Sequence, residues 1–187
     1  MKIGFDLDKV FINTPPFVPN ILIEKLYKKR ANGTLLYRIP GKPEQLVRKV
    51  SHMSILRPAM KKNLDALKKI SKQDNQLYLI SSRFNFLKKH TSDLIKKYDL
   101  DKVFDEMYFN LENIQPHIFK NAIIKKLDLD AYVDDDLSLI KYASIHNPKT
   151  KFFHLKNKGE FQSLSKNVFA ISTLSEMLKH IGEKFKN

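Results

Sequence analysis

Apolar and polar positions follow two patterns that alternate along the chain. Short apolar stretches are typical of strands buried in a parallel sheet. Between them lie longer stretches with apolar residues every three or four positions, which are typical of the helices that connect such strands. The pattern predicts a mainly parallel α/β sheet, with strands at Lys2–Leu7, Gln76–Ile80, Glu106–Phe109, Ala131–Val133, Lys151–His154 and, on a weaker pattern, Val168–Ile171.

Three of the longer stretches have a clear apolar stripe at helical spacing. Such a stripe predicts the side of a helix that packs on the sheet. The stripes are Leu64, Leu67 and Ile70, then Leu87, Thr91, Leu94 and Tyr98, and then Phe119, Ala122, Ile123 and Leu127.

One segment near the N-terminus breaks the alternation. Residues 11–56 contain no convincing strand pattern, and Pro19–Lys29 and Pro43–Met53 predict two helices. Turn-rich sequences separate them, at Ala31-Asn32-Gly33-Thr34 and Pro40-Gly41-Lys42. We therefore predict a main domain of residues 1–10 and 57–187, with residues 11–56 inserted after the first strand. A length of 187 residues fits one domain with a small insertion.

Composition excludes several classes of protein. The chain has no cysteine, which excludes disulfides, thiolate metal sites and cysteine nucleophiles. No stretch is long and apolar enough to predict a membrane span, and Asp6 and Asp8 interrupt the apolar start that a signal peptide would need. We therefore expect a soluble, cytoplasmic protein with no membrane partner. The sequence leaves the oligomeric state open.

The formal net charge of +14 favours an anionic partner. Phosphate esters and nucleic acids both fit this charge. Much of it comes from lysine pairs, which on helices usually form solvated faces, and no arginine-rich, aromatic-rich recognition segment accompanies them. The charge therefore permits nucleic-acid binding without favouring it over a small phosphorylated substrate.

Polar residues follow three of the predicted strands. In a parallel sheet, functional residues gather at the carboxyl ends of the strands, so these side chains are expected to lie together. They are Asp6 and Asp8 after the first strand, Ser81, Ser82 and Arg83 after the second, and Asp134, Asp135 and Asp136 after the fourth. Lys120 lies in the helix that leads into the fourth strand.

These residue types suit phosphoryl transfer. Asp6 and Asp8 together with an aspartate of residues 134–136 would form an all-oxygen site of the kind that Mg²⁺ prefers. Serine hydroxyls can donate hydrogen bonds to phosphate, and Arg83 and Lys120 can neutralise its charge. The combination contains the groups that phosphoryl transfer needs.

Each of these residues also has a purely structural interpretation. Two aspartates near a strand end are often ordinary turn residues, and Asp136 is placed to cap the helix that follows it. Ser81 or Ser82 could cap a helix beginning near Asn85, and a lysine is usually solvated. The hypothesis therefore depends on the order in which the residues follow the strands.

That order resembles the haloacid dehalogenase-like superfamily of phosphatases and phosphotransferases. Four motifs carry the resemblance: Ile3-Gly4-Phe5-Asp6-Leu7-Asp8-Lys9-Val10, Leu77-Tyr78-Leu79-Ile80-Ser81-Ser82-Arg83, Lys120, and Ala131-Tyr132-Val133-Asp134-Asp135-Asp136. The resemblance implies a Rossmann-like three-layer α/β/α sandwich with a central parallel sheet and a small helical cap inserted after the first strand. It also implies that the strand before Asp6 is central, between those before Ser81 and Asp135.

The resemblance further implies a role for each residue. Asp6 would form an aspartyl-phosphate, and Asp8 would act as acid and then as base. Ser81 and Lys120 would contact the transferring phosphoryl group. Mg²⁺ would bind the Asp6 carboxylate, the Asp8 backbone carbonyl and Asp135, with Asp134 as the other candidate ligand. Lys9, Ser82 and Arg83 are candidates for substrate contact, as are Tyr37 and Arg38 in the insertion, for which a plain surface pair is the favoured interpretation.

Lys9 departs from the superfamily pattern, which usually has glycine after the second aspartate. A lysine there brings either the loop geometry or the usual substrate range into question. Three functions fit the sequence. The first is a magnesium-dependent phosphomonoesterase for a small metabolite, with similarity to the 5'(3')-deoxyribonucleotidase branch. The second is a phosphatase of nucleic-acid ends. The third is a binding or regulatory protein without turnover, which Lys9 favours and the complete set of Asp6, Asp8, Ser81, Lys120 and Asp135 opposes.

Overall fold

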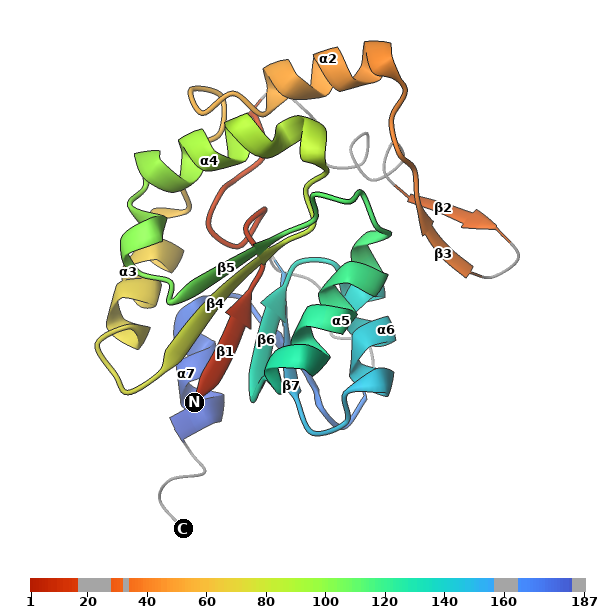
Figure 1. Cartoon of the computed structure of the whole chain (residues 1–187). Coiled ribbons are helices and arrows are strands. Elements are labelled where there is room, and N and C mark those ends of the chain that lie inside the picture. Colours follow the sequence, from red (N-terminus) through yellow and green to blue (C-terminus); the bar gives the residue numbers. More distant parts are fainter. Residues whose placement is uncertain (17–27, 32–33, 157–164, 183–187) are drawn as a thin grey trace.

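A central parallel sheet organises the structure. The computed structural model describes residues 1–16, 28–31, 34–156 and 165–182. Its sheet has the strand order β5-β4-β1-β6-β7-β8, with every neighbouring pair parallel (Figure 1). The strands are β1 (Lys2–Phe5), β4 (Gln76–Ser81), β5 (Glu106–Phe109), β6 (Ala131–Asp134), β7 (Lys151–Leu155) and β8 (Val168–Ile171). All six predicted strands are confirmed, and β1 lies between β4 and β6 as predicted.

Helices cover both faces of this sheet. One layer contains α3 (Lys61–Ile70), α4 (Lys88–Lys97) and α7 (Leu174–Gly182), and the other contains α5 (Pro116–Leu127) and α6 (Leu137–His146) (Figure 1). Two short 3₁₀ helices, η1 (Asn85–Leu87) and η2 (Leu100–Lys102), flank α4. Among the described residues, no helix has the length and apolar character that crossing a membrane requires. The predicted three-layer α/β/α sandwich is confirmed.

Successive side chains of the central strands enter opposite cores. In β4, Leu77 and Leu79 pack in the core beneath α3, α4 and α7, whereas Tyr78 and Ile80 pack beneath α5 and α6. Both faces are buried, which explains why the strands are continuously apolar in sequence. In β1, a Cβ atom at Gly4 would lie only 2.5 Å from Leu129 Cδ1, so no larger residue fits there without displacing the core.

The predicted helical stripes are confirmed for α3 and α4 and only in part for α5. Leu67, Ile70 and Leu94 are fully buried. In α5, however, Ala122 is exposed and Ile124 is buried. Alanine buries little apolar surface, so packing of the larger Ile124 decides which side of α5 faces the sheet.

The inserted segment differs from its prediction. Helix α2 (Lys42–Ser51) confirms the helix expected at Pro43–Met53, but β2 (Lys28–Ala31) and β3 (Thr34–Tyr37) form an antiparallel hairpin where no strand was predicted. Lys28 and Lys29, expected at the end of a helix, belong to β2, and the rest of that predicted helix, residues 19–27, lies outside the described residues. Figure 1 places α2 and the hairpin beyond the carboxyl ends of the sheet strands.

Candidate active site

Asp6 lies at the carboxyl end of β1, next to the end of β6. Its backbone N–H donates a hydrogen bond of 2.9 Å to the carbonyl oxygen of Val133, which brings Asp6 beside Asp134. Lys120, from α5, reaches between them, with Nζ 2.8 Å from Asp6 Oδ1 and 2.8 Å from Asp134 Oδ2. All three side chains are almost completely buried. The Lys120 ammonium group therefore contacts carboxyl groups from both the first and the last of the four predicted motifs.

Asp134 is held from several directions. Its Oδ2 accepts a hydrogen bond of 2.9 Å from the Tyr132 hydroxyl as well as the contact with Lys120, and its Oδ1 accepts one of 2.9 Å from the Asp136 backbone N–H. Burial alone would lower the pKa of Lys120, but Asp134 and Asp6 outweigh burial and raise it well above its usual range. Asp134 thus keeps Lys120 charged and directed at Asp6.

Burial and neighbouring carboxylates both oppose ionisation of Asp6. Burial raises the pKa of Asp6 to about 8 although Lys120 opposes this, and Asp134 adds to the rise. Burial likewise raises the pKa of Asp135 to about 6, against the opposing effect of Lys9. Neighbouring carboxylates resist joint ionisation unless a cation lies between them.

The same carboxylates have the geometry of a metal site. One oxygen from each of Asp6, Asp134 and Asp135 lies within 4.8 Å of the others, so a single cation could contact all three. The donors are hard carboxylate oxygens, which suit Mg²⁺. Both the chemistry of the donors and the unfavourable charge repulsion therefore fit a divalent cation at this point.

Lys9 keeps the backbone conformation that glycine would favour. Its φ of 55° lies in the left-handed region, which costs a residue with a side chain roughly 1–2 kcal/mol. Lys9 therefore adopts a left-handed backbone conformation although it carries a side chain. The Lys9 ammonium lies 3.1 Å from Asp135 Oδ2, so the side chain contacts one of the predicted metal ligands.

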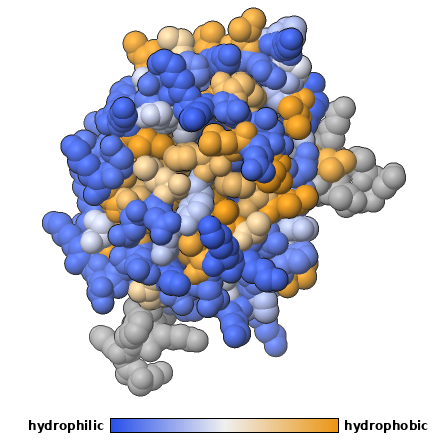
Figure 2. Space-filling model, viewed as in Figure 1, coloured by the Kyte–Doolittle hydropathy of each residue, from blue (hydrophilic) through white to orange (hydrophobic). Residues whose placement is uncertain are grey.

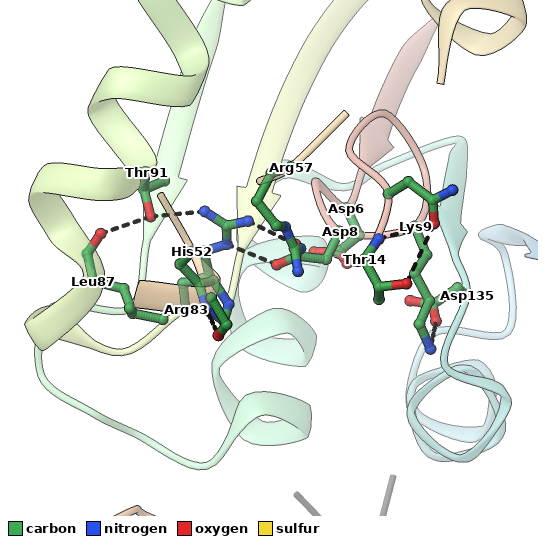
Figure 3. A network of polar contacts seen from close by, with 12 residues as sticks. Asp6, Asp8, Lys9, Thr14, His52, Arg57, Arg83, Leu87, Thr91 and Asp135 are labelled. Carbon is green, nitrogen blue, oxygen red and sulfur yellow. Dashed lines mark hydrogen bonds and ion pairs between the residues drawn. The ribbon is translucent and has the colours of Figure 1, made fainter. Parts of the chain in front are cut away.

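Asp8 is bound by two arginines from separate parts of the chain. Arg83, after β4, donates from Nε to Asp8 Oδ2 at 2.7 Å and from Nη2 to Asp8 Oδ1 at 2.6 Å. Arg57, which precedes α3, also contacts Asp8 Oδ1, and Figure 3 shows both guanidinium groups directed at this carboxylate. Burial would raise the pKa of Asp8, but Arg83 and Arg57 outweigh burial and hold it well below its usual range.

A cavity of about 420 Å³ opens between the insertion and the sheet. Its lining includes Asp6, Asp8, Asp135, Ser81 and Lys120 from the core. The insertion contributes Thr14, Pro15, Tyr37, Glu44, Val47, Arg48, Ser51 and His52. Its size is within the usual range for small-molecule sites.

His52 lies behind the arginines and is held neutral. Burial lowers its pKa to about 3, assisted by Arg83, and its Nδ1 lies 2.7 Å from the Arg48 carbonyl oxygen. In the unfolded chain the imidazole recovers its ordinary pKa of 6.5. Between pH 6.5 and pH 3 the unfolded state therefore binds a proton that the folded state does not, and stability falls as the pH falls.

We predict that His52→Gln removes this acid sensitivity. The difference in unfolding free energy between wild type and His52→Gln should change by up to about 1.4 kcal/mol per pH unit below pH 6, in the direction that disfavours wild type. Urea unfolding across this range would measure it. His146→Gln, at an exposed histidine on α6, serves as the control and should follow wild type. If the free energy of unfolding changed with pH in the same way in wild type and His52→Gln, the prediction would be contradicted.

Ser81 presents a buried hydroxyl at the base of the cavity. Its side chain is almost fully buried, and among the described residues its Oγ has no hydrogen-bond partner. A buried polar group in this state is costly unless a ligand or water satisfies it. Ser82 also lines the cavity, and neither serine caps η1, since the residue before that helix is Phe84, without a side-chain capping bond.

Residues of the insertion contact the core directly at Asp136. The Tyr37 hydroxyl donates a hydrogen bond of 2.7 Å to Asp136 Oδ2, and Tyr37 stacks on His117 at 5.8 Å between ring centroids. Asp136 Oδ1 caps α6 by accepting from the Ser138 and Leu139 backbone N–H groups, as one interpretation of the sequence predicted. Tyr37 is therefore a buried contact between the insertion and the core, whereas Arg38 pairs with Glu44.

The structure places most of the predicted site residues around this cavity: Asp6, Asp8, Lys9, Ser81, Ser82, Arg83, Lys120 and Asp135, together with Tyr37. Arg38, the other candidate in the insertion, is not among the lining residues. Arg57 and Arg48 line the cavity and were not predicted from the sequence. The only sequence signal for them is that arginine is rare here, with five among 34 basic residues.

Structure comparison identifies the fold, whereas sequence comparison finds nothing: no protein-family model and no curated protein sequence matches this chain. A haloacid dehalogenase-like family hydrolase from Streptococcus pneumoniae superposes with a TM-score of 0.63 at 12% identity, over 96% of this chain and 97% of that protein. A haloacid dehalogenase-like family hydrolase from Xanthomonas campestris superposes with a TM-score of 0.60 at 10% identity, over 97% of this chain and 94% of that protein.

A third similar structure carries ligands. It is a D,D-heptose 1,7-bisphosphate phosphatase from B. bronchiseptica in complex with magnesium and phosphate, with a TM-score of 0.56 at 11% identity over 98% of this chain and 99% of that protein. At such identities the likeness establishes the fold and not the reaction. The chain has the haloacid dehalogenase-like fold that its four motifs predicted.

Proposed function

We propose that this chain, which has the haloacid dehalogenase-like fold, is a magnesium-dependent phosphomonoesterase that acts on a small phosphorylated metabolite. One observation carries the proposal: Lys120 joins Asp6 to Asp134, with Asp135 close enough to share a cation and the unsatisfied hydroxyl of Ser81 lining the same cavity. Carboxylates, an ammonium group and a hydroxyl donor in one cavity suit a phosphate and the metal that accompanies it.

In the proposed reaction, an Asp6 carboxylate oxygen attacks phosphorus. The bond from phosphorus to the ester oxygen breaks and an aspartyl-phosphate forms. Water then attacks this phosphorus, giving up a proton to Asp8 and releasing inorganic phosphate and the Asp6 carboxylate. Lys120 and Ser81 neutralise and orient the phosphoryl group. Mg²⁺, held by the Asp6 and Asp135 carboxylates and the Asp8 carbonyl, with Asp134 as the alternative ligand, would neutralise charge on the phosphoryl oxygens.

The arginines on Asp8 affect the first of these steps. They hold Asp8 ionised in the free protein, which suits its role as base toward water. The leaving alcohol, however, needs a proton. A phosphate monoester near neutral pH exists partly as the monoanion, whose remaining proton can pass to the leaving oxygen or to Asp8. An aryl phosphate, whose leaving group needs no proton, should therefore be the easiest substrate to detect.

Magnesium dependence is the first test. We predict that the protein hydrolyses p-nitrophenyl phosphate with added Mg²⁺, and that complete chelation lowers the rate at least about a hundredfold, because a metal contributes several kcal/mol to stabilising the transition state. Readdition of Mg²⁺ should restore the rate. A panel of nucleoside monophosphates and sugar phosphates would then identify the substrate class, and we propose nucleotides as the first candidates.

The non-catalytic alternative has one observation in its favour. The Lys9 ammonium lies on Asp135, where the family would place its metal, so a protein that had lost turnover could retain this arrangement. Such a protein would show no hydrolysis of any substrate in the panel with any divalent ion. A phosphatase of nucleic-acid ends would instead prefer oligonucleotide ends to mononucleotides, with an affinity that falls steeply with salt.

Ser81 allows activity and stability to be separated. Removing a hydroxyl that makes no hydrogen bond to any described residue should leave the urea midpoint of Ser81→Ala unchanged or slightly raised. Loss of its hydrogen bond to a charged phosphate should lower kcat/KM by about tenfold to a hundredfold. Ser144→Ala is the matched control, because that buried hydroxyl donates to the Lys141 carbonyl outside the cavity. Ser144→Ala should have a lower urea midpoint and an unchanged kcat/KM. A lower midpoint with an unchanged kcat/KM in Ser81→Ala would refute the proposed role of Ser81.

We also propose that residues 11–56 act as a cap on the core formed by residues 1–10 and 57–187. Helix α2 supplies one wall of the cavity, and Tyr37 fastens the insertion to Asp136. Exposed apolar residues on and beside α2 lie at the top of the molecule, where Figure 1 places this helix (Figure 2). They include Leu46, Val47, Val50 and Met53.

A further inference from the structure

Two ammonium groups contact the carboxylate cluster, and they differ in exposure. Lys120 contacts Asp6 and Asp134, whereas Lys9 contacts Asp135, with its Nζ 3.1 Å from Oδ2 (Figure 3). The Lys120 side chain is only 3% exposed, but the side chains of Lys9 and Asp135 are 26% and 20% exposed. Lys120 is therefore fixed in the core, and Lys9 is the ammonium group whose place a cation from solvent can take.

The backbone of Lys9 points to a function for its side chain. Its φ of 55° is one that glycine adopts without cost and that a residue with a side chain adopts only under strain. Strain of this kind persists where the surrounding structure enforces it, and it is often found at functional sites. The chain thus carries a positive charge at a position where the backbone favours no side chain at all.

The contact between Lys9 and Asp135 conflicts with binding of a metal. Asp135 contributes one of the three carboxylates that a single cation could contact. A divalent cation at Asp135 would share this carboxylate with the Lys9 ammonium, and the two positive charges would repel each other. Salt screens this repulsion only in part, because the two side chains are partly buried. Magnesium must therefore weaken the contact between Lys9 and Asp135 in order to bind.

A phosphate group would reverse this effect. Lys9 lines the same cavity as Ser81 and Lys120, the residues expected to contact the phosphate. A phosphate monoester near neutral pH carries between one and two negative charges, so it attracts the ammonium group and the metal alike. The lysine side chain is a flexible four-carbon stem, which allows its ammonium group to turn from Asp135 to a neighbouring anion.

We propose that Lys9 is a tethered cation that competes with Mg²⁺ for Asp135 in the substrate-free protein and contacts the substrate phosphate once Mg²⁺ has displaced it. The free protein then holds magnesium weakly, and holds it firmly only together with a phosphate group. This inference rests on the proposed function, because it places the metal and the phosphate in the same cavity.

The affinity for Mg²⁺ tests this inference without requiring turnover. Isothermal titration calorimetry would give the Kd of Mg²⁺ for wild type and for Lys9→Met, which keeps an unbranched side chain at this backbone position and removes the charge. Without phosphate, Lys9→Met should bind Mg²⁺ at least about tenfold more tightly, the factor that a contact with a charged group typically contributes. With excess inorganic phosphate the difference should fall to about threefold or less. Equal affinities without phosphate, or a tenfold difference that persists with phosphate, would overturn the inference.

A second lysine controls for net charge. Lys89→Met also breaks a contact between an ammonium group and a carboxylate, with Asp93 on α4 and outside the cavity, and should bind Mg²⁺ as wild type does. The same gain in Lys89→Met as in Lys9→Met would reduce the effect to overall charge and overturn the inference. Thermal unfolding shows whether each variant is folded. If Lys9→Met is not, Lys9→Gly decides, because glycine also lacks the charge, adopts this φ without strain and should show the same gain.

Hydrolysis of p-nitrophenyl phosphate by the wild-type protein, measured in parallel, separates this inference from the proposed function. Hydrolysis without tighter Mg²⁺ binding by Lys9→Met refutes only the competition. Tighter binding that phosphate abolishes, without hydrolysis by wild type, refutes the proposed reaction and retains the competition. Absence of Mg²⁺ binding to both proteins, with and without phosphate, overturns the inference and the proposed metal dependence together.

Discussion

An Asp6→Asn variant is expected to hydrolyse p-nitrophenyl phosphate about a thousandfold or more slowly than the wild-type protein. The amide has nearly the shape of the carboxylate but is a poor nucleophile, so the aspartyl-phosphate cannot form. Lys120 would still contact Asp134, and the cavity would keep its other lining residues. Initial rates with saturating Mg²⁺ over a range of substrate concentrations would provide kcat/KM for both proteins.

Stability distinguishes loss of chemistry from loss of fold in this variant. Burial raises the pKa of Asp6 to about 8, so without metal the folded state holds a proton that the unfolded state releases above pH 3.8. The contribution of Asp6 to the free energy of unfolding of the wild-type protein is therefore lost as the pH rises from about 4 towards 8. The amide of Asp6→Asn does not titrate, so the variant has no such pH dependence at this position. At pH 8 the variant should be at least as stable as wild type. Asp93→Asn, at an exposed aspartate on α4, should keep full activity. Substantial hydrolysis by folded Asp6→Asn would exclude the nucleophilic role.

The central strands of the sheet could be predicted from sequence because they are buried on both faces. Such strands are apolar throughout, and the amphipathic helices between them separate one strand from the next. The ends of strands were less certain, as at β1, which ends at Phe5 although the predicted strand extended to Leu7. Leu7 is buried beyond the end of the strand, so its burial reflects packing of the loop and not strand pairing.

The hairpin was missed because two local signals conflict. Asn-Gly, present here as Asn32-Gly33, is a strong hairpin signal when strand-forming residues flank it. On one side, however, the flanking residues are Lys28, Lys29 and Arg30, which have little strand preference and read as the end of a helix. The hairpin residue Tyr37 packs on His117 of α5, a tertiary contact that local periodicity does not reveal.

The core of the site was predictable for a topological reason. Asp6, Ser81 and Asp135 each lie at or directly after the last residue of a strand, and adjacent parallel strands bring their carboxyl ends together. Arg57 and Arg48 belong to no such pattern. Arg48 reaches the cavity because residues 11–56 lie over the end of the sheet, and that placement depends on contacts such as the one between Tyr37 and Asp136, whereas Arg57 lies in the connection from that segment to α3. Sequence periodicity does not encode these contacts.

Replacing Lys120 by methionine should have the largest effect on stability. Lys120 Nζ contacts two buried aspartates, Asp134 and the Asp6 that is protonated in metal-free protein at neutral pH, and methionine can fill the space without supplying the positive charge. Removing one partner from a buried ionic group typically costs about 3–5 kcal/mol, because the remaining charge is left in a poorly solvated place. Urea unfolding of metal-free protein at neutral pH should therefore show a loss of this size for Lys120→Met.

Lys89→Met, at a lysine outside the cavity, is the control for Lys120→Met. Addition of Mg²⁺ then tests whether the lost positive charge explains the lost stability. Lys89→Met also breaks a lysine–aspartate pair, with Asp93 on the surface of α4, and should change the unfolding midpoint little because exposed pairs contribute little. The Mg²⁺ that we propose at this site should raise the midpoint of Lys120→Met more than that of wild type, since the cation would offset the repulsion that Lys120 normally neutralises. Hydrolysis should remain low even then, because the phosphoryl group has lost its cationic contact. Equal losses of stability in the two variants, or an equal response to Mg²⁺ in wild type and Lys120→Met, would contradict a shared electrostatic role for Lys120 and the metal.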